Sequence, residues 1–285
     1  MKGFLVLIAL SLPFFCQAQR LHLDLYAGVS NYQGDLQDAV FTLKKARPAF
    51  GLGATYDLTN HLAVRGSFSI AKVEGNDSDN KAGKGTELRN LNFKSNITEG
   101  NIALQYNFLD ISVYGFTPYV FAGGAVYHFN PYTVLDSSGT KVYLQPLRTE
   151  GQGLSAYPDR KPYKLTQFAI PFGGGITLGL TENIEVGFEL GFRKLFHDYL
   201  DDVSTNYADP TILATQISPL SADLAFRGDE LPNGITFPGA GEQRGNPKLK
   251  DWYYITGLRF SFLLGNGNGG GGKKSRGTGC PTNIY

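Results

Sequence analysis

Seven segments of the chain alternate between apolar and polar residues with a period of two, as β-strands with two unlike faces do, and an eighth, 117–129, is apolar on both sides. In residues 21–30, Leu21, Leu23 and Leu25 fall on one face and Asp24 falls on the other. The segments are 10–16 residues long, whereas strands of soluble sandwiches average about 5–6 and tilted membrane-crossing strands need about 9–11. The eight predicted strands are 21–30, 48–58, 61–73, 97–109, 117–129, 165–180, 184–196 and 252–264.

The connections between these strands alternate in length. Residues 58–60, a turn near Asp110 and residues 181–183 form the short ones. The long ones are 31–46, 74–92, 130–164 and 197–251. This alternation predicts an all-β fold: an eight-stranded antiparallel transmembrane outer-membrane β-barrel with short periplasmic turns, long extracellular loops and both termini in the periplasm. A secreted β-sandwich or lipocalin-like barrel, with its apolar face turned inward, is the alternative that periodicity leaves open.

Three features favour the membrane. The polar strand faces are rich in Gly, Ser, Thr and Asn, which are small enough for the interior of a narrow barrel. The last strand, 255–262, is similar to the outer-membrane insertion signal, with a Gly followed by two spaced aromatic residues. Aromatic residues also gather near strand ends, where interfacial girdles are expected: Tyr56, Tyr106, Phe108, Phe192, Phe196, Trp252 and Tyr254.

The amino-acid composition excludes several other classes of protein. The 285 residues include 36 Gly, 13% aromatic and 18% charged residues, and the net charge is +1. A basic excess for nucleic-acid binding is absent, the aromatic content is too high for a disordered chain, and Gly is too dense for a helical bundle. No cofactor is predicted.

The first 18 residues predict a signal peptide, with Lys2 before an apolar run at 4–15 and cleavage after Ala18. A short membrane anchor is an alternative, as is lipidation of Cys16, although the bulky Phe15 precedes that cysteine. The predicted organisation is therefore a signal peptide at 1–18, a barrel at 19–264 and a Gly-rich periplasmic tail at 265–285.

Charged residues on the polar strand faces predict a network of ion pairs inside the barrel. Side chains roughly fill an eight-stranded barrel, so a solute channel is not expected and buried charges need partners. We expect Glu189 to lie beside Arg259 on the neighbouring strand, and Asp24 to match Arg65 across the lumen. A proton or ion path is the alternative use of these charges. The predicted lumen network is Asp24, Arg65, Glu99, Glu189, Arg193 and Arg259, with Glu185 on the same face.

The longest loop, 197–251, contains two helix-start signals, Asp209-Pro210 and Ser218-Pro219. A loop of this length with helix signals is expected to be folded and functional. Its structured base is predicted at Asp198, Tyr199, Asp201 and Asp202 as a hydrogen-bonded group. As an alternative, Asp198, Asp201, Asp202 and Asp209 hold a calcium ion. His128 and His197 near the outer strand ends raise the alternative of an enzyme at the outer rim, although no catalytic residue is predicted.

The tail combines a glycine linker at 265–272, a basic cluster and one cysteine. A lone cysteine in an exported protein suggests an intermolecular disulfide or a free thiol. The predicted partner-binding residues are Cys280, Lys273, Lys274 and Arg276. A disulfide to a partner, non-covalent partner binding and an inert tail all remain open.

The opening residues Leu21–Leu36, with Gly28, Asn31-Tyr32 and Gly34-Asp35-Leu36, resemble the first strand of the PorG-like outer-membrane proteins of Bacteroidota. Two more stretches, Arg193–Tyr207 and Gly245–Phe262, are similar to the same family. The departure is His22, where an acidic or aromatic residue is expected.

This resemblance implies a non-enzymatic component of the type IX protein secretion and gliding machinery. Such a barrel associates with a periplasmic ring built from a lipoprotein and a soluble partner, and a tail with one cysteine suits such a tether. The implied partners are outer-membrane lipids, the periplasmic lipoprotein through Cys280, and the translocon. A passive structural or adhesive outer-membrane barrel is the alternative.

Overall fold

The chain folds into one closed barrel of eight antiparallel strands. The computed structural model describes residues 21–37, 42, 44–80, 85–135 and 139–264. The barrel strands are β1 (Leu21–Gln33), β2 (Arg47–Asp57), β3 (Leu62–Asn76), β4 (Asn92–Asn107), β5 (Phe116–His128), β8 (Thr166–Gly179), β9 (Ile184–Leu195) and β10 (Trp252–Leu263). Each pairs with the next along the chain, and β10 closes the ring on β1. All eight predicted strands are therefore present.

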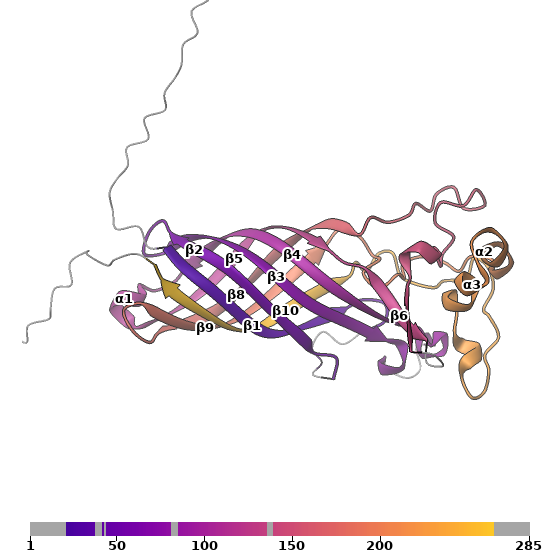
Figure 1. Ribbon diagram of the computed structural model, residues 1–285, viewed down its shortest axis with the longest axis horizontal. Coiled ribbons are helices and arrows are strands. Elements are labelled where there is room, and N and C mark those ends of the chain that lie inside the picture. Colours follow the sequence, from indigo (N-terminus) through magenta and orange to yellow (C-terminus); the bar gives the residue numbers. More distant parts are fainter. Residues whose placement is uncertain (1–20, 38–41, 43, 81–84, 136–138, 265–285) are drawn as a thin grey trace, which may run out of the picture.

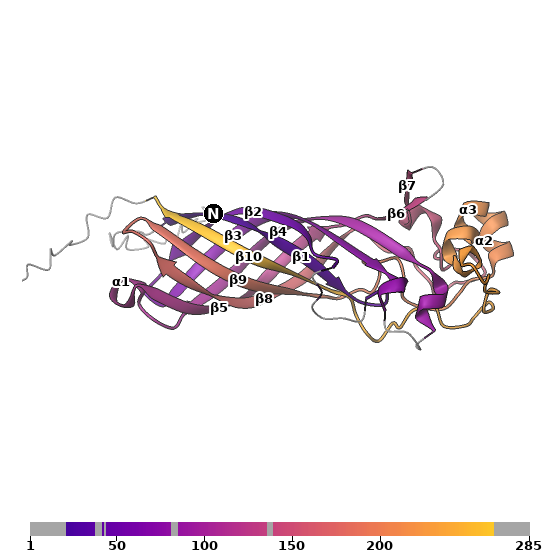
Figure 2. The same cartoon turned by 90° about the horizontal axis from the view of Figure 1, so that it is seen from below.

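The remaining elements lie at or beyond the ends of the barrel. The hairpin of β6 (Pro131–Leu135) and β7 (Thr140–Tyr143) extends the sheet from β4. Helix α1 (Ile111–Tyr114) lies at one end of the barrel, and α2 (Pro210–Gln216) and α3 (Pro219–Ala225) lie beyond the other end (Figure 1 and Figure 2). Short 3-10 turns complete the loops: η1 (Asp77–Asp79), η2 (Thr86–Arg89), η3 (Gln145–Leu147) and η4 (Gly228–Glu230).

The predicted helix starts in the long loop are correct. The Asp209 carboxylate accepts hydrogen bonds from the backbone N–H groups of Thr211 and Ile212, which caps α2. The Ser218 hydroxyl does the same for the N–H of Ser221 at the start of α3. In both helices proline follows the cap, where its missing N–H costs no helical hydrogen bond. No helix among the described residues is long and apolar enough to cross a membrane.

The apolar strand faces point outward. Ile102 on β4 and Phe168 on β8 are each 69% exposed, whereas the alternate positions Ala103 and Ala169 are buried. A soluble sandwich or lipocalin would place these large side chains inside, so that alternative is excluded. A closed barrel leaves no unpaired strand edge, and an apolar exterior of this kind requires lipid around it. The protein is thus an outer-membrane β-barrel.

Glycines allow the narrow interior to hold large side chains. Gly175 on β8 faces the lumen beside Tyr119 of β5. A Cβ at Gly175 would lie 2.3 Å from the Phe188 carbonyl oxygen and 2.7 Å from the Tyr119 hydroxyl. The run Gly173-Gly174-Gly175 therefore provides space for a tyrosine within the barrel wall.

Candidate functional site

The lumen is closed by two groups of buried ion pairs. In the first, Arg65 of β3 donates to both carboxylate oxygens of Glu189 on β9, at 2.7 and 3.0 Å. The Tyr119 hydroxyl donates to the same carboxylate at 2.8 Å. Arg259 of β10 lies 4.0 Å from Glu189, and Arg65 and Arg259 both donate to the side-chain oxygen of Gln105, at 3.3 and 3.0 Å. This group joins strands from opposite sides of the barrel.

The second group is centred on Glu99 of β4. Arg193 of β9 donates to both of its oxygens, at 3.0 and 3.1 Å. The Tyr253 hydroxyl and the Asn101 amide complete the shell, at 2.5 and 2.8 Å. Burying a charge in a low-dielectric interior is unfavourable unless the charge is paired and hydrogen-bonded. The Arg193–Glu99 pair meets this requirement, because two hydrogen bonds join the two groups and Glu99 accepts further ones from Tyr253 and Asn101.

The structure places all six predicted lumen residues inside the barrel but corrects one pairing. Arg65 binds Glu189 and not Asp24. Asp24 instead accepts hydrogen bonds from the hydroxyls of Thr55 and Ser261, each at 2.5 Å. Both hydroxyls belong to the strands beside β1, so Asp24 finds its partners on adjacent strands and needs no cation. The expected proximity of Glu189 and Arg259 is present.

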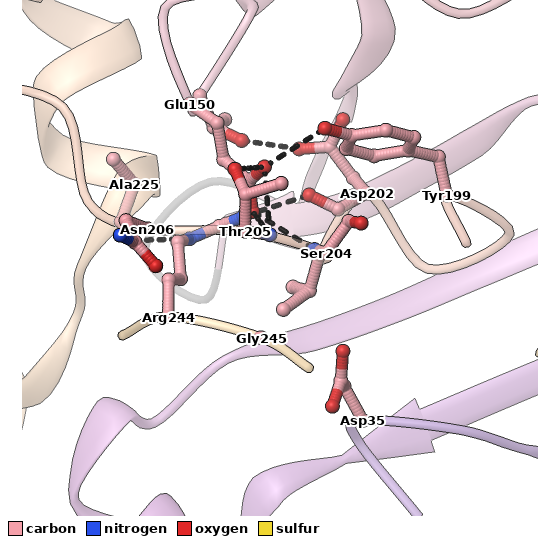
Figure 3. A network of polar contacts seen from close by, with 12 residues as sticks. Asp35, Glu150, Tyr199, Asp202, Ser204, Thr205, Asn206, Ala225, Arg244 and Gly245 are labelled. Carbon is pink, nitrogen blue, oxygen red and sulfur yellow. Dashed lines mark hydrogen bonds and ion pairs between the residues drawn. The ribbon is translucent and has the colours of Figure 1, made fainter. Parts of the chain in front are cut away.

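At the long-loop end, four loops pack into a cap around one buried ion pair. Arg244 and Glu150, from different loops, are 3.0 Å apart (Figure 3). Glu150 also accepts from the Ser204 and Thr205 backbone N–H groups, at 2.9 and 3.1 Å, and from the Tyr199 hydroxyl at 3.0 Å.

Arg244 uses its remaining donors on backbone carbonyls. It donates to Asp202 O at 2.7 Å and to Ala225 O at 3.1 Å, which ties α3 to the loop base. A second arginine, Arg89, binds both oxygens of Asp77 and donates to the carbonyls of Asp35 and Arg244. The loops 34–46, 77–91, 144–165 and 196–251 are thereby cross-linked.

The four residues predicted at the loop base lie in this cap with separate roles. Asp202 has a left-handed backbone (φ 69°) and accepts from the hydroxyls of Thr149 and Tyr163, each at 2.6 Å. Asp201 accepts from the Tyr32 hydroxyl at 2.5 Å, and Asp198 from the Ser204 hydroxyl at 2.9 Å. Tyr199 stacks on Tyr163, with ring centroids 4.8 Å apart.

Burial raises the pKa of several of these acids. The pKa of Asp202 is raised to about 6 and that of Asp198 to about 7, in each case mainly by desolvation. Asp201 and Asp251 both hydrogen-bond the Tyr32 hydroxyl, and burial together with repulsion from neighbouring carboxylates raises both pKa values well above the usual range. Among the described residues no group of three or more acidic, His or Cys side chains is arranged to hold a metal ion. Asp198, Asp201 and Asp202 thus form a hydrogen-bonded group at the base of the loop.

The two histidines of the rim-enzyme alternative are not brought together. His128 is exposed at the end of β5, where it hydrogen-bonds Thr166. The half-buried His197 stacks beside Tyr127 and Phe129, with ring centroids 6.0 and 5.0 Å away, and its Nε2 is hydrogen-bonded to the Tyr127 hydroxyl. Desolvation by these surroundings lowers the pKa of His197 to about 4, so it is neutral at pH 7 and serves as a stacking element.

The short-turn end of the barrel is open. A cavity of about 400 Å³ opens there, lined by polar side chains from β1, β2, β4, β5, β8, β9 and β10 and from two turns. On its wall His22 and Asp57 are 2.9 Å apart, and Glu185 makes no hydrogen bond within the described residues. Arg259 separates the cavity from the Glu189 group. We refer to this cavity as the vestibule.

The pattern of single strands could not reveal Glu150, Arg244, Arg89 and Asp77, because each lies in an irregular loop. Asp77 and Arg89 meet within one loop, whereas Glu150 and Arg244 meet only through contacts between distant loops. The tail residues Cys280, Lys273, Lys274 and Arg276, and the predicted signal peptide, lie outside the described residues.

Comparison with known proteins places the chain in a family. Residues 1–216 match the family described as "Domain of unknown function (DUF6089)", and the chain belongs to it. No curated protein has a matching sequence.

Solved outer-membrane barrels are similar in fold. The attachment invasion locus protein Ail of Yersinia pestis, solved with the heparin analogue sucrose octasulfate, is 10% identical, with a TM-score of 0.39 over 86% of this chain and 100% of Ail. A major outer membrane protein of Thermus thermophilus is 13% identical, with a TM-score of 0.39 over 87% and 100%. OprG of Pseudomonas aeruginosa is 11% identical, with a TM-score of 0.38 over 86% and 94%.

Proposed function

We propose that this protein is a non-enzymatic outer-membrane anchor for a periplasmic complex of the type IX secretion and gliding machinery. The observation that carries the proposal is the contrast between the two ends of the barrel. The long-loop end is sealed by a packed cap, and the short-turn end holds the open vestibule. Both the start of β1 and the end of β10 lie at the vestibule end, where Leu264 N–H donates to Leu21 O.

The closed lumen supports an anchor over a transporter. Arg65, Glu189, Arg193 and Glu99 are all buried across the interior, so solutes have no path between the two ends. A barrel that conducts nothing can still hold a partner at one membrane face. Leu264, the last residue that the structure describes, lies at the vestibule end, which is the face that the turn pattern assigns to the periplasm.

The resemblance to PorG-like proteins supplies the partner class. The predicted partner is the lipoprotein of a periplasmic ring, held through Cys280 by a disulfide and through Lys273, Lys274 and Arg276 by charge. The cell-surface side of the same barrel is free to meet the translocon. Membership of the DUF6089 family is compatible with this role and names no function by itself.

The test is an affinity pull-down from solubilised outer membrane without reductant. It compares the wild type with Cys280→Ser, with Lys273→Gln/Lys274→Gln/Arg276→Gln and with a deletion of 265–285. We expect a covalent adduct with a periplasmic lipoprotein that disappears in Cys280→Ser, and reduced secretion in the deletion. A deletion strain that secretes normally and captures no partner contradicts the anchor and favours a passive structural or adhesive barrel.

A further inference from the structure

Two lysines lie directly above the lipid-facing surface of β3 and β4. On β3 the outward residues Phe68 and Ile70 are 48% and 52% exposed, and the next outward position is the exposed Lys72. On β4 the exposed Lys94 lies on the same outward face, separated from Ile102 by Asn96, Thr98 and Gly100. The strand register pairs Lys72 with Asn96 and Glu74 with Lys94. The two lysines are therefore diagonal neighbours on one face of the sheet.

Three more cations gather around this pair. Arg47 lies 2.6 Å from Glu74, and Lys45 lies 2.9 Å from Asp79. On the β6–β7 hairpin the Lys141 ammonium lies 3.8 Å from the ring centre of Tyr132, the residue that pairs with Lys94. We call Lys45, Arg47, Lys72, Lys94 and Lys141 the basic patch.

The charge of the patch is only partly neutralised. Glu74 and Asp79 are its anions, and both are engaged by Arg47 or Lys45. Lys72 and Lys94 have no ion pair within the described residues. A ligand that complements two ammonium groups beside an apolar surface has an anionic head group and an apolar tail.

We propose that the basic patch binds the phosphate groups of an anionic lipid in the outer leaflet. Lys72 and Lys94 contact the phosphate, and the acyl chains run along Phe68, Ile70 and Ile102 below it. Lys72 directly continues the lipid-facing column of Phe68 and Ile70, which favours a lipid phosphate over a soluble one. This site is on the outer wall and is independent of the vestibule and the tail.

The experiment measures lipid binding by the full chain in phosphatidylcholine nanodiscs with diphosphoryl lipid A as the probe. The double variant Lys72→Gln/Lys94→Gln removes both ammonium groups. Lys194→Gln is the matched control, because Lys194 is also an exposed lysine near the loop end of its strand but lies on β9, on the far side of the ring. Lys72→Arg/Lys94→Arg keeps the charge and guards against a folding defect.

We expect the glutamine pair to weaken lipid A binding about tenfold, with the arginine pair and Lys194→Gln close to the wild type. Equal binding by the glutamine pair overturns the proposal, as does an equal loss in Lys194→Gln, which would indicate a general charge effect. Full displacement of the lipid by millimolar inorganic phosphate would assign the site to soluble phosphate and also overturns it.

Discussion

The lumen and the cap are both built on arginine–carboxylate pairs, but they hold different things together. In the lumen, Arg65–Glu189 and Arg193–Glu99 connect regular strands that are already hydrogen-bonded to their neighbours. In the cap, Arg244–Glu150 connects loops that have few backbone hydrogen bonds between them. The lumen pairs therefore add to a barrel that backbone hydrogen bonds already hold together, whereas the cap pair determines whether the loops pack against one another.

The largest expected effect comes from removing one partner in the lumen. Glu99→Ala leaves the Arg193 guanidinium buried without a counter-charge, which costs about 3–5 kcal/mol of unfolding free energy. The measurement is urea unfolding of the folded band on a semi-native gel. Glu185→Gln, at a carboxylate without a hydrogen bond, is the control and should change the midpoint little. An unchanged midpoint in Glu99→Ala would mean that water or a rearranged side chain compensates the charge.

A smaller and more local effect is expected in the cap. Arg244→Ala leaves the Glu150 carboxylate buried without a counter-charge and the carbonyls of Asp202 and Ala225 without their donor. The free energy of unfolding of the cap alone should fall by about 2–4 kcal/mol. Hydrogen exchange and protease cleavage should increase in the cap loops while the barrel keeps its gel mobility. Lys248→Ala on the exposed loop surface is the control. Loss of the folded band in Arg244→Ala would show instead that cap and barrel unfold together.

The cap should also loosen as the pH rises, whereas the lumen pairs should not respond. Asp198 and Asp202, with folded pKa values of about 7 and 6, bind protons in the folded cap that the unfolded chain has already released. Cap stability therefore falls between about pH 4 and pH 7, since the folded state binds more protons. His197 acts in the opposite direction, because its lowered pKa disfavours the folded state in acid.

The acids outnumber the histidine, so we expect cap hydrogen exchange to be about tenfold faster at pH 8 than at pH 5 after correction for intrinsic rates. Asp198→Asn should flatten the dependence. A profile that rises in stability over this range would show that His197 dominates.

The smallest expected effect is at a helix cap. Asp209→Ala removes the acceptor for Thr211 and Ile212 N–H and costs α2 about 1 kcal/mol. Exchange of the first amides of α2 should increase several-fold, while α3, capped separately by Ser218, keeps its protection. An effect that spreads to both helices would indicate that they form one cooperative unit.

The sequence predicts the barrel well because the strands obey a strict alternation. Lipid outside and a narrow lumen inside force large apolar and small polar residues into register, and the loop lengths then reveal which end is which. Residues such as Arg193 and Glu189 could be assigned to the lumen from the same alternation. The partner of Asp24 is harder to predict, because alternation alone does not give the register that places the hydroxyls of Thr55 and Ser261 beside it.

The cap was predictable only in outline. The helix starts at Asp209 and Ser218 can be predicted because their signals are local. The Glu150–Arg244 pair cannot, because it joins residues 94 positions apart in the chain. No period or motif connects residues in separate irregular loops. The acidic run at 198–202 showed that the loop base is special but not that its acids would be divided among Ser204, Tyr32 and Tyr163.

The pairing of β1 with β10 sets the order of assembly. Their register runs from His22 with Leu263 to Gln33 with Trp252, so the first and last strands of the barrel are partners. The ring cannot close until the end of the chain has been synthesised and exported, and the intervening hairpins must wait with apolar faces exposed. Folding of the closed barrel is therefore post-translational by geometry, and the unclosed chain exposes apolar strand faces that favour aggregation until β10 pairs with β1.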